Sequence, residues 1–379
     1  MTDTTPRLFL WNWKALQDAK SRASSNDPTI QPALDKLRSD LDRARAFKPV
    51  SVMSKELIPP SGDKHDYLSQ GPYWWPNPDT TDGLPYVRRD GEVNPEVETL
   101  DSRKQGGMIG AVETLALGWY FFDDVTFADH AALLLRTWFL DPETRMNPHL
   151  EYGQSIPGIC EGRGIGIIDT ASYCKLIESI GLLDLSGAIT DMDRSDLLMW
   201  MKGYREWLVA SETGQSEARQ HNNHGTWYDA QLCALALYTG DPRIVEKVAE
   251  EAKAYRISTQ IEPGGSQPHE LVRTRSMSYS CMNITGLLNI ARYAEHAGVD
   301  LWNYATIDER SIRKSVDFLV PYVVNGDQWT WQQISDFDRA SLAPIFKRLS
   351  LAIDDPSYID AIEFLPDDAV ADRAHLCFG

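Results

Sequence analysis

The sequence predicts an all-α fold, an incomplete α/α toroid (barrel) of about six or seven helical hairpins with a long aromatic-rich loop. Helical segments with short breaks follow one another through most of the 379 residues. No run of alternating apolar and polar residues is strong enough to predict a sheet. A bundle or a solenoid fits these two observations as well. The toroid is favoured because the polar clusters fall in breaks between helices, where one end of a ring would bring them together.

The N-terminal part contains two predicted helices, over residues 10–22 and 30–47. The second carries apolar residues three and four positions apart, the spacing of one buried helix face. This periodicity stops over residues 49–101, where Pro, Gly, Asp, Tyr and Trp dominate. Loops of this length are usually functional or disordered, and the aromatic residues argue against disorder. We therefore expect an ordered functional loop, with room for a short strand or two.

Helices are predicted in close succession after this loop. Several are apolar around most of their circumference, as over residues 131–140, which indicates burial on more than one side. No repeat of fixed period and no low-complexity linker divides the chain, so we expect a single catalytic domain over residues 1–379. The predicted helices span residues 105–122, 126–140, 165–183, 193–211, 225–239, 242–257, 276–297 and 309–324.

Composition limits the partners. A formal net charge of -18 argues against binding to nucleic acid or to an anionic membrane, since both require a basic face. A polyanionic substrate stays compatible with this charge if arginines are concentrated locally. The 12 Trp and 15 Tyr suit stacking on sugar rings, although large cores use aromatic residues too. The 5 cysteines form no CxxC pair and predict buried thiols rather than a zinc site or a disulfide framework.

The localisation stays open. No apolar run reaches the length of a membrane span, and the first seven residues lack the basic-then-apolar layout of a secretory signal. As written, the sequence is that of a soluble cytoplasmic protein. If a signal was trimmed, the same sequence would belong to a secreted or periplasmic protein.

The first polar cluster is the run His-Asn-Asn-His-Gly-Thr-Trp-Tyr-Asp-Ala at residues 221–230, at a predicted helix start. An asparagine at such a position caps the helix, and capping alone would explain either Asn222 or Asn223. Two amides, two imidazoles and two aromatic rings exceed what a cap needs. His221 and His224 have no third ligand nearby, so we expect no metal and no other cofactor.

The second polar cluster covers residues 267–280 and places two arginines near a tyrosine. On a helix, Arg275 and Tyr279 are four residues apart on one face, whereas Arg273 meets Tyr279 only if the backbone turns between them. Either arrangement puts a cation beside a phenol. The structural alternative is that the arginines bond surface carboxylates and that Tyr279 is a core residue.

These residue types favour elimination over hydrolysis. Glycosidases typically need two carboxylates, and neither cluster supplies an obvious pair, nor does a GxSxG motif occur. Arginine, amide and imidazolium donors can neutralise a uronate carboxylate and stabilise the anion that forms when the C5 proton leaves. A tyrosine can take that proton and return it to the leaving oxygen where C5–H and C4–O share a face, as in mannuronate and glucuronate. In guluronate they lie on opposite faces, which calls for a second group such as His224.

Four segments resemble the alginate lyase superfamily of polysaccharide lyases, in a branch that includes enzymes on alginate and on glucuronan. They are Tyr-Trp-Trp-Pro-Asn-Pro at 73–78, Met-Asn-Pro-His-Leu-Glu-Tyr-Gly-Gln-Ser-Ile-Pro-Gly at 146–158, Asn-Asn-His-Gly-Thr-Trp-Tyr-Asp at 222–229, and Gln-Pro-His-Glu-Leu-Val-Arg at 267–273. The resemblance extends over residues 50–330 and implies an incomplete α/α toroid with a long groove.

The resemblance also implies site residues. Asn223, His224 and Arg273 correspond to the set that neutralises the carboxylate, and Tyr279 corresponds to the proton-transferring tyrosine. The step from Arg273 to Tyr279 is one residue shorter than in the family pattern, so Arg275 is a rival for the same role. The residues expected to bind substrate are Arg275, Gln154, Tyr73, Trp74 and His269.

The sequence therefore predicts a carbon–oxygen lyase that cleaves a uronic-acid polysaccharide by β-elimination, with alginate or polymannuronate favoured. The expected partner is this anionic polysaccharide, and the oligomeric state is unknown. A glucuronan lyase with the same mechanism is one alternative. An α/α-toroid hydrolase of unsaturated oligouronides and a non-catalytic polyuronate-binding protein are the others.

Overall fold

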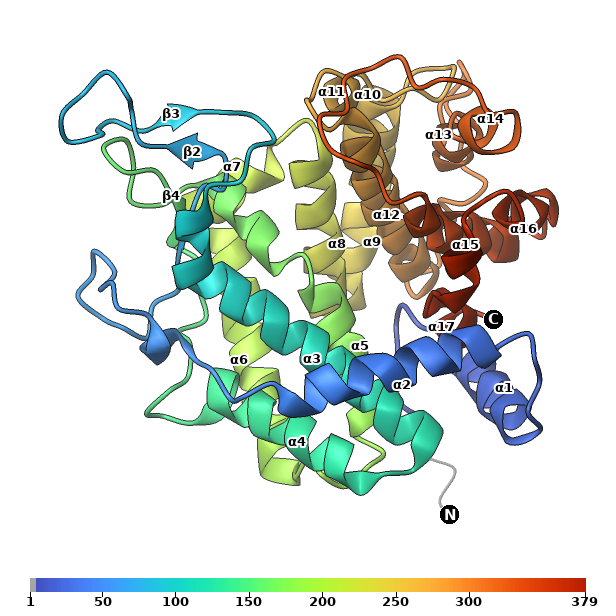
Figure 1. Cartoon of the computed structure of the whole chain (residues 1–379), viewed down its shortest axis with the longest axis horizontal. Coiled ribbons are helices and arrows are strands. Elements are labelled where there is room, and N and C mark those ends of the chain that lie inside the picture. Colours follow the sequence, from blue (N-terminus) through green and yellow to red (C-terminus); the bar gives the residue numbers. More distant parts are fainter. Residues whose placement is uncertain (1–4) are drawn as a thin grey trace. The chain divides into compact units, whose positions relative to one another are not determined.

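The computed structural model describes residues 5–379, most of which are helical. They form two compact units (Figure 1). Unit 1 contains the chain through Asp40 together with His221–Gly379, and unit 2 contains Leu41–Gln220. Helix α2 (Gln31–Ala46) crosses the boundary between them. The single catalytic domain over residues 1–379 stays a prediction.

Unit 1 is organised around α8 (Asn223–Tyr238) and α12 (Ser276–Glu295), which pack along each other (Figure 1). Both helices are buried around most of their circumference, as their apolar composition predicts. Their close approach requires Gly286, because a Cβ at this position would lie 2.9 Å from the Thr226 side chain. Helix α9 (Pro242–Ala252) covers α8 and buries Val245, Val248, Ala249 and Ala252, all on one face.

The remaining helices of unit 1 are shorter than α8 and α12. They are α1 (Trp13–Ser24), α10 (Ser258–Gln260), α11 (Pro268–Leu271), α13 (Ile312–Asp317), α14 (Val320–Val324), α15 (Ala343–Ile353), α16 (Ser357–Ile362) and α17 (Ala374–Cys377).

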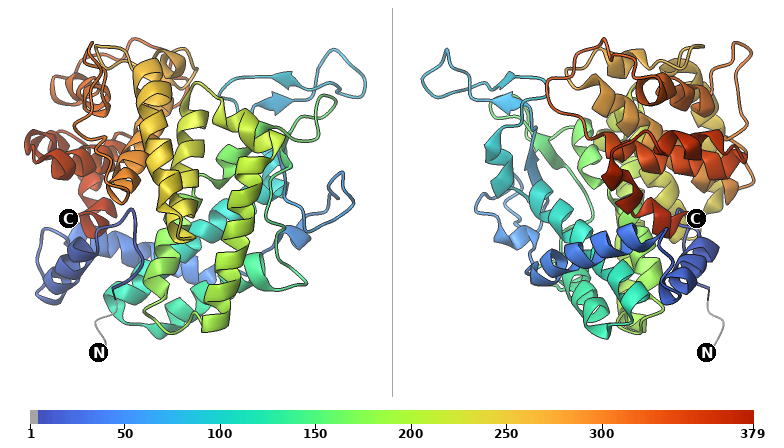
Figure 2. Two further views of the ribbon diagram at one scale, coloured as in Figure 1. Left: turned by 180° about the vertical axis from the view of Figure 1, so that it is seen from behind. Right: turned by 45° about the vertical axis from the view of Figure 1, so that its right-hand side comes forward.

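Unit 2 is built on α3 (Asp101–Phe122), which packs against α4 (Val125–Leu135) and α5 (Tyr173–Leu183). Helices α6 (Asp191–Ala210) and α7 (Glu212–Ala218) complete its helical part. Two small sheets accompany them. Strand β1 (Leu68–Gln70) pairs in parallel with β4 (Tyr152–Ser155), and β2 (Trp74–Trp75) pairs antiparallel with β3 (Val87–Arg88). The β2–β3 hairpin extends away from the helices of this unit (Figure 2).

The observed elements differ from the predicted ones where the local pattern is interrupted. The predicted helix over 165–183 begins as a 3-10 turn (Gly164–Thr170), and α5 starts only at Tyr173. In that turn Gly166 crosses the backbone of Gly153 so closely that a Cβ would lie 2.3 Å from it. The predicted helix over 309–324 is two helices, α13 and α14, with Pro321 at the start of the second.

Other differences concern short elements. The predicted helices over 126–140 and 242–257 end in π-helical turns, Arg136–Leu140 and Lys253–Ile257. Strands β1 to β3 lie inside the long loop, where a short strand or two was expected. Helices α7, α11 and α15 to α17 were not predicted, because four to eleven residues carry too little periodicity to distinguish them from loops.

The long loop over 49–101 is ordered, as predicted, and a buried ion pair closes it. The Lys55 ammonium lies 3.0 Å from Asp101 Oδ2, and both side chains are fully buried. Lys55 also donates hydrogen bonds of 2.8 Å to the carbonyls of Val52 and Lys64, and the Leu68 amide donates to Asp101. Burial lowers the pKa of Lys55 and raises that of Asp101. The charged forms of Lys55 and Asp101 are therefore stable in this buried position only while each has the other and its hydrogen-bond partners.

No helix between residues 5 and 379 is both long and apolar enough to cross a membrane. The first four residues, which belong to the segment where no secretory signal is expected, lie outside the described part of the chain.

We expect Lys55→Met to destabilise the protein by about 3–5 kcal/mol, because it leaves the Asp101 carboxylate buried without its cation. The midpoint of urea unfolding, followed by circular dichroism, measures this change. Lys202→Met is the matched control, because Lys202 and Glu206 form an exposed ion pair, 3.9 Å apart, with side chains 59% and 62% exposed. This variant should change the free energy of unfolding by no more than about 1 kcal/mol. Equal midpoints for both variants would show that the pair does not hold the loop.

Candidate active site

Helix α8 begins at the first polar cluster predicted from the sequence. Asn222 is its N-cap, and its side chain accepts a hydrogen bond of 3.2 Å from the His224 amide. This satisfies one of the free N–H groups at the helix start, so the capping role is confirmed for Asn222. The cap directs the next residue, Asn223, inward, where it is fully buried.

Asn223 joins the first polar cluster to the second through Glu270 of α11. Its backbone N–H donates to Glu270 Oε1 and its side-chain Nδ2 donates to Glu270 Oε2, both at 2.7 Å. Asn223 is 0% exposed and Glu270 is 1% exposed. Burial raises the pKa of Glu270, while the bonds from Asn223 and the charges of Arg273 and His224 oppose that rise.

The chain turns between α11 and α12 and places a guanidinium on a tyrosine ring. The Arg273 Cζ atom lies 3.8 Å from the centroid of the Tyr279 ring, a close cation–π contact. Tyr279 sits in the first turn of α12, where its amide bonds the Arg275 carbonyl at 3.0 Å. Of the two arrangements that the sequence left open, the turned backbone with Arg273 on Tyr279 is the one observed.

Arg275 occupies a different position from Arg273. It is the residue before α12, and its backbone forms an isolated antiparallel bridge with Gln333. Within residues 5–379, its buried Nε has no hydrogen-bond partner. Arg275 is thus a half-buried cation four residues before Tyr279, and in the described part of the chain the guanidinium found over the Tyr279 ring is that of Arg273.

Two histidines from the two clusters also meet. The rings of His221 and His269 lie 4.5 Å apart, edge to face. Burial lowers the pKa of His269, and the neighbouring His221 lowers it further. His269 immediately precedes Glu270, so the two histidine rings lie near the hydrogen-bonded contact between Asn223 and Glu270.

A buried network of amides and hydroxyls underlies the site. Asn283 of α12 donates to Gln260 and Gln267 at 3.0 and 2.7 Å, and Thr226 of α8 donates to Gln260 at 2.9 Å. Gln267 in turn donates to the Ser280 carbonyl at 3.2 Å. The network ties α8, α10 and α12 to the residue that precedes α11, so the segments that carry the polar clusters have a common rigid base.

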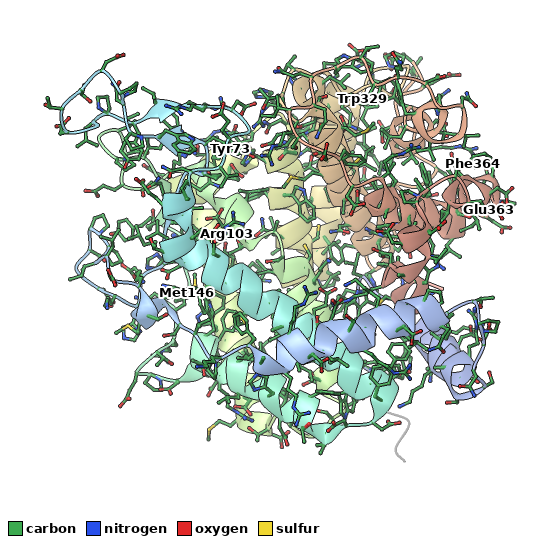
Figure 3. The ribbon with its side chains drawn as sticks, in the orientation of Figure 1. Tyr73, Arg103, Met146, Trp329, Glu363 and Phe364 are labelled. Carbon is green, nitrogen blue, oxygen red and sulfur yellow. The ribbon has the colours of Figure 1, made fainter. Side chains whose placement is uncertain are left out.

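An extended segment holds the start of α12 from the other side. Trp329 Nε1 donates to Ser276 Oγ at 2.8 Å, and Gln333 contacts both the Met277 amide and Ser278 Oγ at 3.1 Å. Trp329 lies at the same end of unit 1 as α11 (Figure 3). This strap, residues 329–335, was missed in the sequence because nothing in its composition links it to residues some fifty positions earlier.

Gln154 belongs to unit 2 and is buried there. Its backbone has a φ of +48°, its Nε2 donates to Asp169 at 3.0 Å, and its Oε1 and carbonyl oxygen accept two bonds from Arg163 at 3.0 Å. Asp169 also accepts from Ser69 at 2.6 Å. The Gln154 amide therefore bridges a carboxylate and a guanidinium.

The predicted aromatic residues of the long loop lie beside this bridge in unit 2. The Arg163 guanidinium is 5.9 Å from the centroid of the Trp74 ring. Tyr73, labelled in Figure 3, accepts a backbone hydrogen bond of 2.8 Å from Arg89, next to the β2–β3 hairpin. The Trp74 ring thus lies against an arginine side chain, and a backbone hydrogen bond fixes the position of Tyr73.

Among the described residues, no group of three or more His, Cys, Asp or Glu side chains has the arrangement of a metal site.

Comparison with known protein families now identifies the chain. The model of the alginate lyase family matches residues 51–329. The chain belongs to the alginate lyase family. It is therefore a polysaccharide lyase, a carbon–oxygen lyase by reaction class. Comparison with the curated proteins finds no match.

Solved structures of family members resemble the chain over nearly its full length. An alginate lyase from Bacteroides ovatus is 38% identical, with 99% of this chain and 100% of that chain covered and a TM-score of 0.94. Alginate lyase A1-III from Sphingomonas species A1 is 15% identical, with 96% and 94% covered and a TM-score of 0.63. A variant of A1-III complexed with tetrasaccharide has a TM-score of 0.59 at 16% identity, with 93% and 96% covered. The predicted α/α-toroid class of this alginate lyase is confirmed.

Sequence reasoning missed Glu270 as an individual residue of the site. Glu270 lies in the Gln-Pro-His-Glu run of the second polar cluster, but a single carboxylate does not match the pair that glycosidases need. An acid directly after a histidine and three residues before an arginine is the sequence signal that could have indicated it.

We expect the pKa of His269 to lie below the usual pKa of a histidine. The variant His221→Ala should raise the pKa of His269, because it removes a neighbouring group that disfavours the charged form. Histidine ring signals followed by NMR across pH measure both values. His296→Asn serves as the control and should leave the titration of His269 unchanged. A His269 pKa that stays the same in His221→Ala would contradict the coupling of the two rings.

Proposed function

We propose that this alginate lyase cleaves alginate, with polymannuronate favoured, by β-elimination at the site around Tyr279. The observation that carries the proposal is the Arg273 guanidinium stacked 3.8 Å from the centre of the Tyr279 ring. A cation at this position stabilises a phenolate, which is the form of tyrosine that accepts a proton. The alginate lyase from Bacteroides ovatus, 38% identical over the whole chain, supports alginate as the substrate.

The first chemical requirement of the reaction is to neutralise the carboxylate of the sugar. Removing the C5 proton places a second negative charge beside it, so donors must neutralise it beforehand. We propose that Arg273 serves here as well as at Tyr279, because the N–H groups in the plane of a guanidinium match the geometry of a carboxylate. His224 and Asn223, at the start of α8, are the other members of the proposed set.

Tyr279 then takes the C5 proton, and the C4–O bond breaks to leave a 4,5-unsaturated sugar at the new non-reducing end. In mannuronate and glucuronate the departing oxygen lies on the same face, so Tyr279 can return the proton to it. One tyrosine in the first turn of a buried helix therefore suits these sugars best. Guluronate requires a donor on the opposite face, for which we propose His224.

A polyanion approaching a chain of net charge -18 needs a local cationic surface. We propose that Arg275 supplies part of it in unit 1 and that His269 binds the substrate there as a hydrogen-bond donor. We propose that Tyr73 and Trp74 of unit 2 stack on sugar rings. Gln154 is buried, with its amide engaged by Arg163 and Asp169. We therefore propose that Gln154 acts on the substrate through the position of Arg163.

We expect the protein to generate ultraviolet absorbance from polymannuronate, and Tyr279→Phe to lower kcat by at least about 10³-fold while keeping the fold, because no other group replaces the phenol. Absorbance of the unsaturated product is the measurement, with polyguluronate, glucuronan and other polyuronates in the same panel. Circular dichroism controls for folding. No product from any polyuronate would refute the proposed function, and wild-type rates in Tyr279→Phe would refute the proposed mechanism.

We expect Arg273→Lys to lower kcat/KM by about 10²-fold although the charge is kept, because an ammonium provides neither the planar stack nor the paired in-plane donors. Initial rates with polymannuronate measure the loss. Arg219→Lys, on the residue that follows α7, is the control and should keep full activity. If kcat/KM falls by about 10²-fold in Arg275→Lys and stays near wild type in Arg273→Lys, Arg275 is the neutralising residue instead.

A further inference from the structure

The hydrogen bonds between Asn223 and Glu270 do not use one polar atom, the side-chain oxygen Oδ1 of Asn223. Glu270 accepts both the backbone N–H and the side-chain Nδ2–H of Asn223 at 2.7 Å. This arrangement suits an ionised carboxylate, which only accepts hydrogen bonds. Within residues 5–379, the Asn223 Oδ1 on the other side of the amide is buried and has no hydrogen-bond partner. Buried acceptors of this kind are rare and destabilising.

The orphan oxygen is also of the wrong kind for the proposed reaction. A substrate carboxylate beside it would meet a second acceptor, whereas neutralisation requires a donor. A half-turn of the amide about its Cβ–Cγ bond exchanges the two atoms in place. The Nδ2 group then takes the position of Oδ1 and becomes the donor that the carboxylate needs.

This exchange sets one condition on Glu270. With Oδ1 turned toward Glu270 Oε2, that oxygen has to carry a proton and donate it, while Oε1 still accepts the Asn223 backbone N–H. The backbone hydrogen bond is kept, the side-chain hydrogen bond is reversed so that Glu270 Oε2 donates to Asn223 Oδ1, and the orphan acceptor is satisfied. A protonated Glu270 and an Asn223 amide whose NH₂ group points away from Glu270 are therefore two parts of a single arrangement.

We propose that Glu270 is a positioning residue that works in its protonated form and turns the Asn223 amide so that its NH₂ group faces the substrate carboxylate. The proposal rests on the proposed uronate-lyase function and assigns Glu270 a role within that site. Glu270 does not touch the substrate and acts only through Asn223.

The surroundings decide how Glu270 titrates. His224 faces it from α8 and Arg273 from the segment after α11, and both favour the ionised form. Burial outweighs them and raises the pKa of Glu270. A bound uronate adds a negative charge to the site, which raises it further. Since the protonated form is the active one, activity is lost as pH rises through the pKa of Glu270 in the complex.

Glu270→Gln tests the proposal, because glutamine reproduces the protonated acid permanently. Its carbonyl accepts the Asn223 backbone N–H and its NH₂ donates to Oδ1. We expect kcat/KM on polymannuronate within about 5-fold of wild type at acidic pH, and activity that persists at alkaline pH where wild type declines. A loss of about 100-fold at every pH, or an unchanged alkaline decline, would overturn the proposal.

Further variants separate this role from a structural one. Glu270→Ala offers neither acceptor nor donor and should lower kcat, whereas Glu262→Gln, an exposed glutamate of the preceding loop, should behave as wild type in rate and pH profile. If Glu270→Gln unfolds at a lower temperature than wild type, the carboxyl carbon of Glu270 is titrated by ¹³C NMR in Tyr279→Phe with a mannuronate oligosaccharide bound. A protonated carboxyl at neutral pH supports the proposal, and an ionised one overturns it.

The wild-type measurement keeps the two proposals distinct. If wild type forms no unsaturated product from any polyuronate, the proposed function fails. If wild type is active and Glu270→Gln is not, only the role of Glu270 fails.

Discussion

The structure of unit 1 depends on a buried hydrogen-bonded contact between two segments far apart in the chain. Asn223 at the start of α8 and Glu270 of α11 share two hydrogen bonds with almost no exposure to water. Because Glu270 is desolvated, the hydrogen bonds from Asn223 and the nearby charges of Arg273 and His224 compensate for its burial. The contact therefore sets where α11 lies against α8, and with it the turn that places Arg273 on Tyr279.

Around this contact lie a cationic side chain and several imidazoles, although the chain as a whole is strongly negative. The net charge of -18 repels polyanions, yet Arg273, His224 and the paired rings of His221 and His269 gather within one part of unit 1. The Arg273 cation acts at short range, where screening by salt is weakest, and the imidazoles add hydrogen-bonding groups beside it. The proposed attraction of a uronate polymer thus depends on the site and not on the net charge of the chain.

Rigid supports recur in both units. The amide network of Gln260, Gln267 and Asn283 fixes the helices beneath the proposed catalytic residues, and the strap at 329–335 fixes the start of α12. In unit 2, the Lys55–Asp101 pair closes the long loop. Side chains that must meet a transition state need such support, because displacements of one ångström are costly in rate.

The sequence by itself determined the helical class, the loop over 49–101, a cap at either Asn222 or Asn223, and the residue types of the proposed site. These follow from spacing along the chain, which reflects hydrogen bonds between near neighbours. Only the tertiary structure decided that Arg273 stacks on Tyr279, that Gln154 is buried in a bridge, and that Glu270 holds Asn223. Residues 223 and 270 lie 47 positions apart, and such contacts depend on how whole helices pack, for which no local pattern carries a signal.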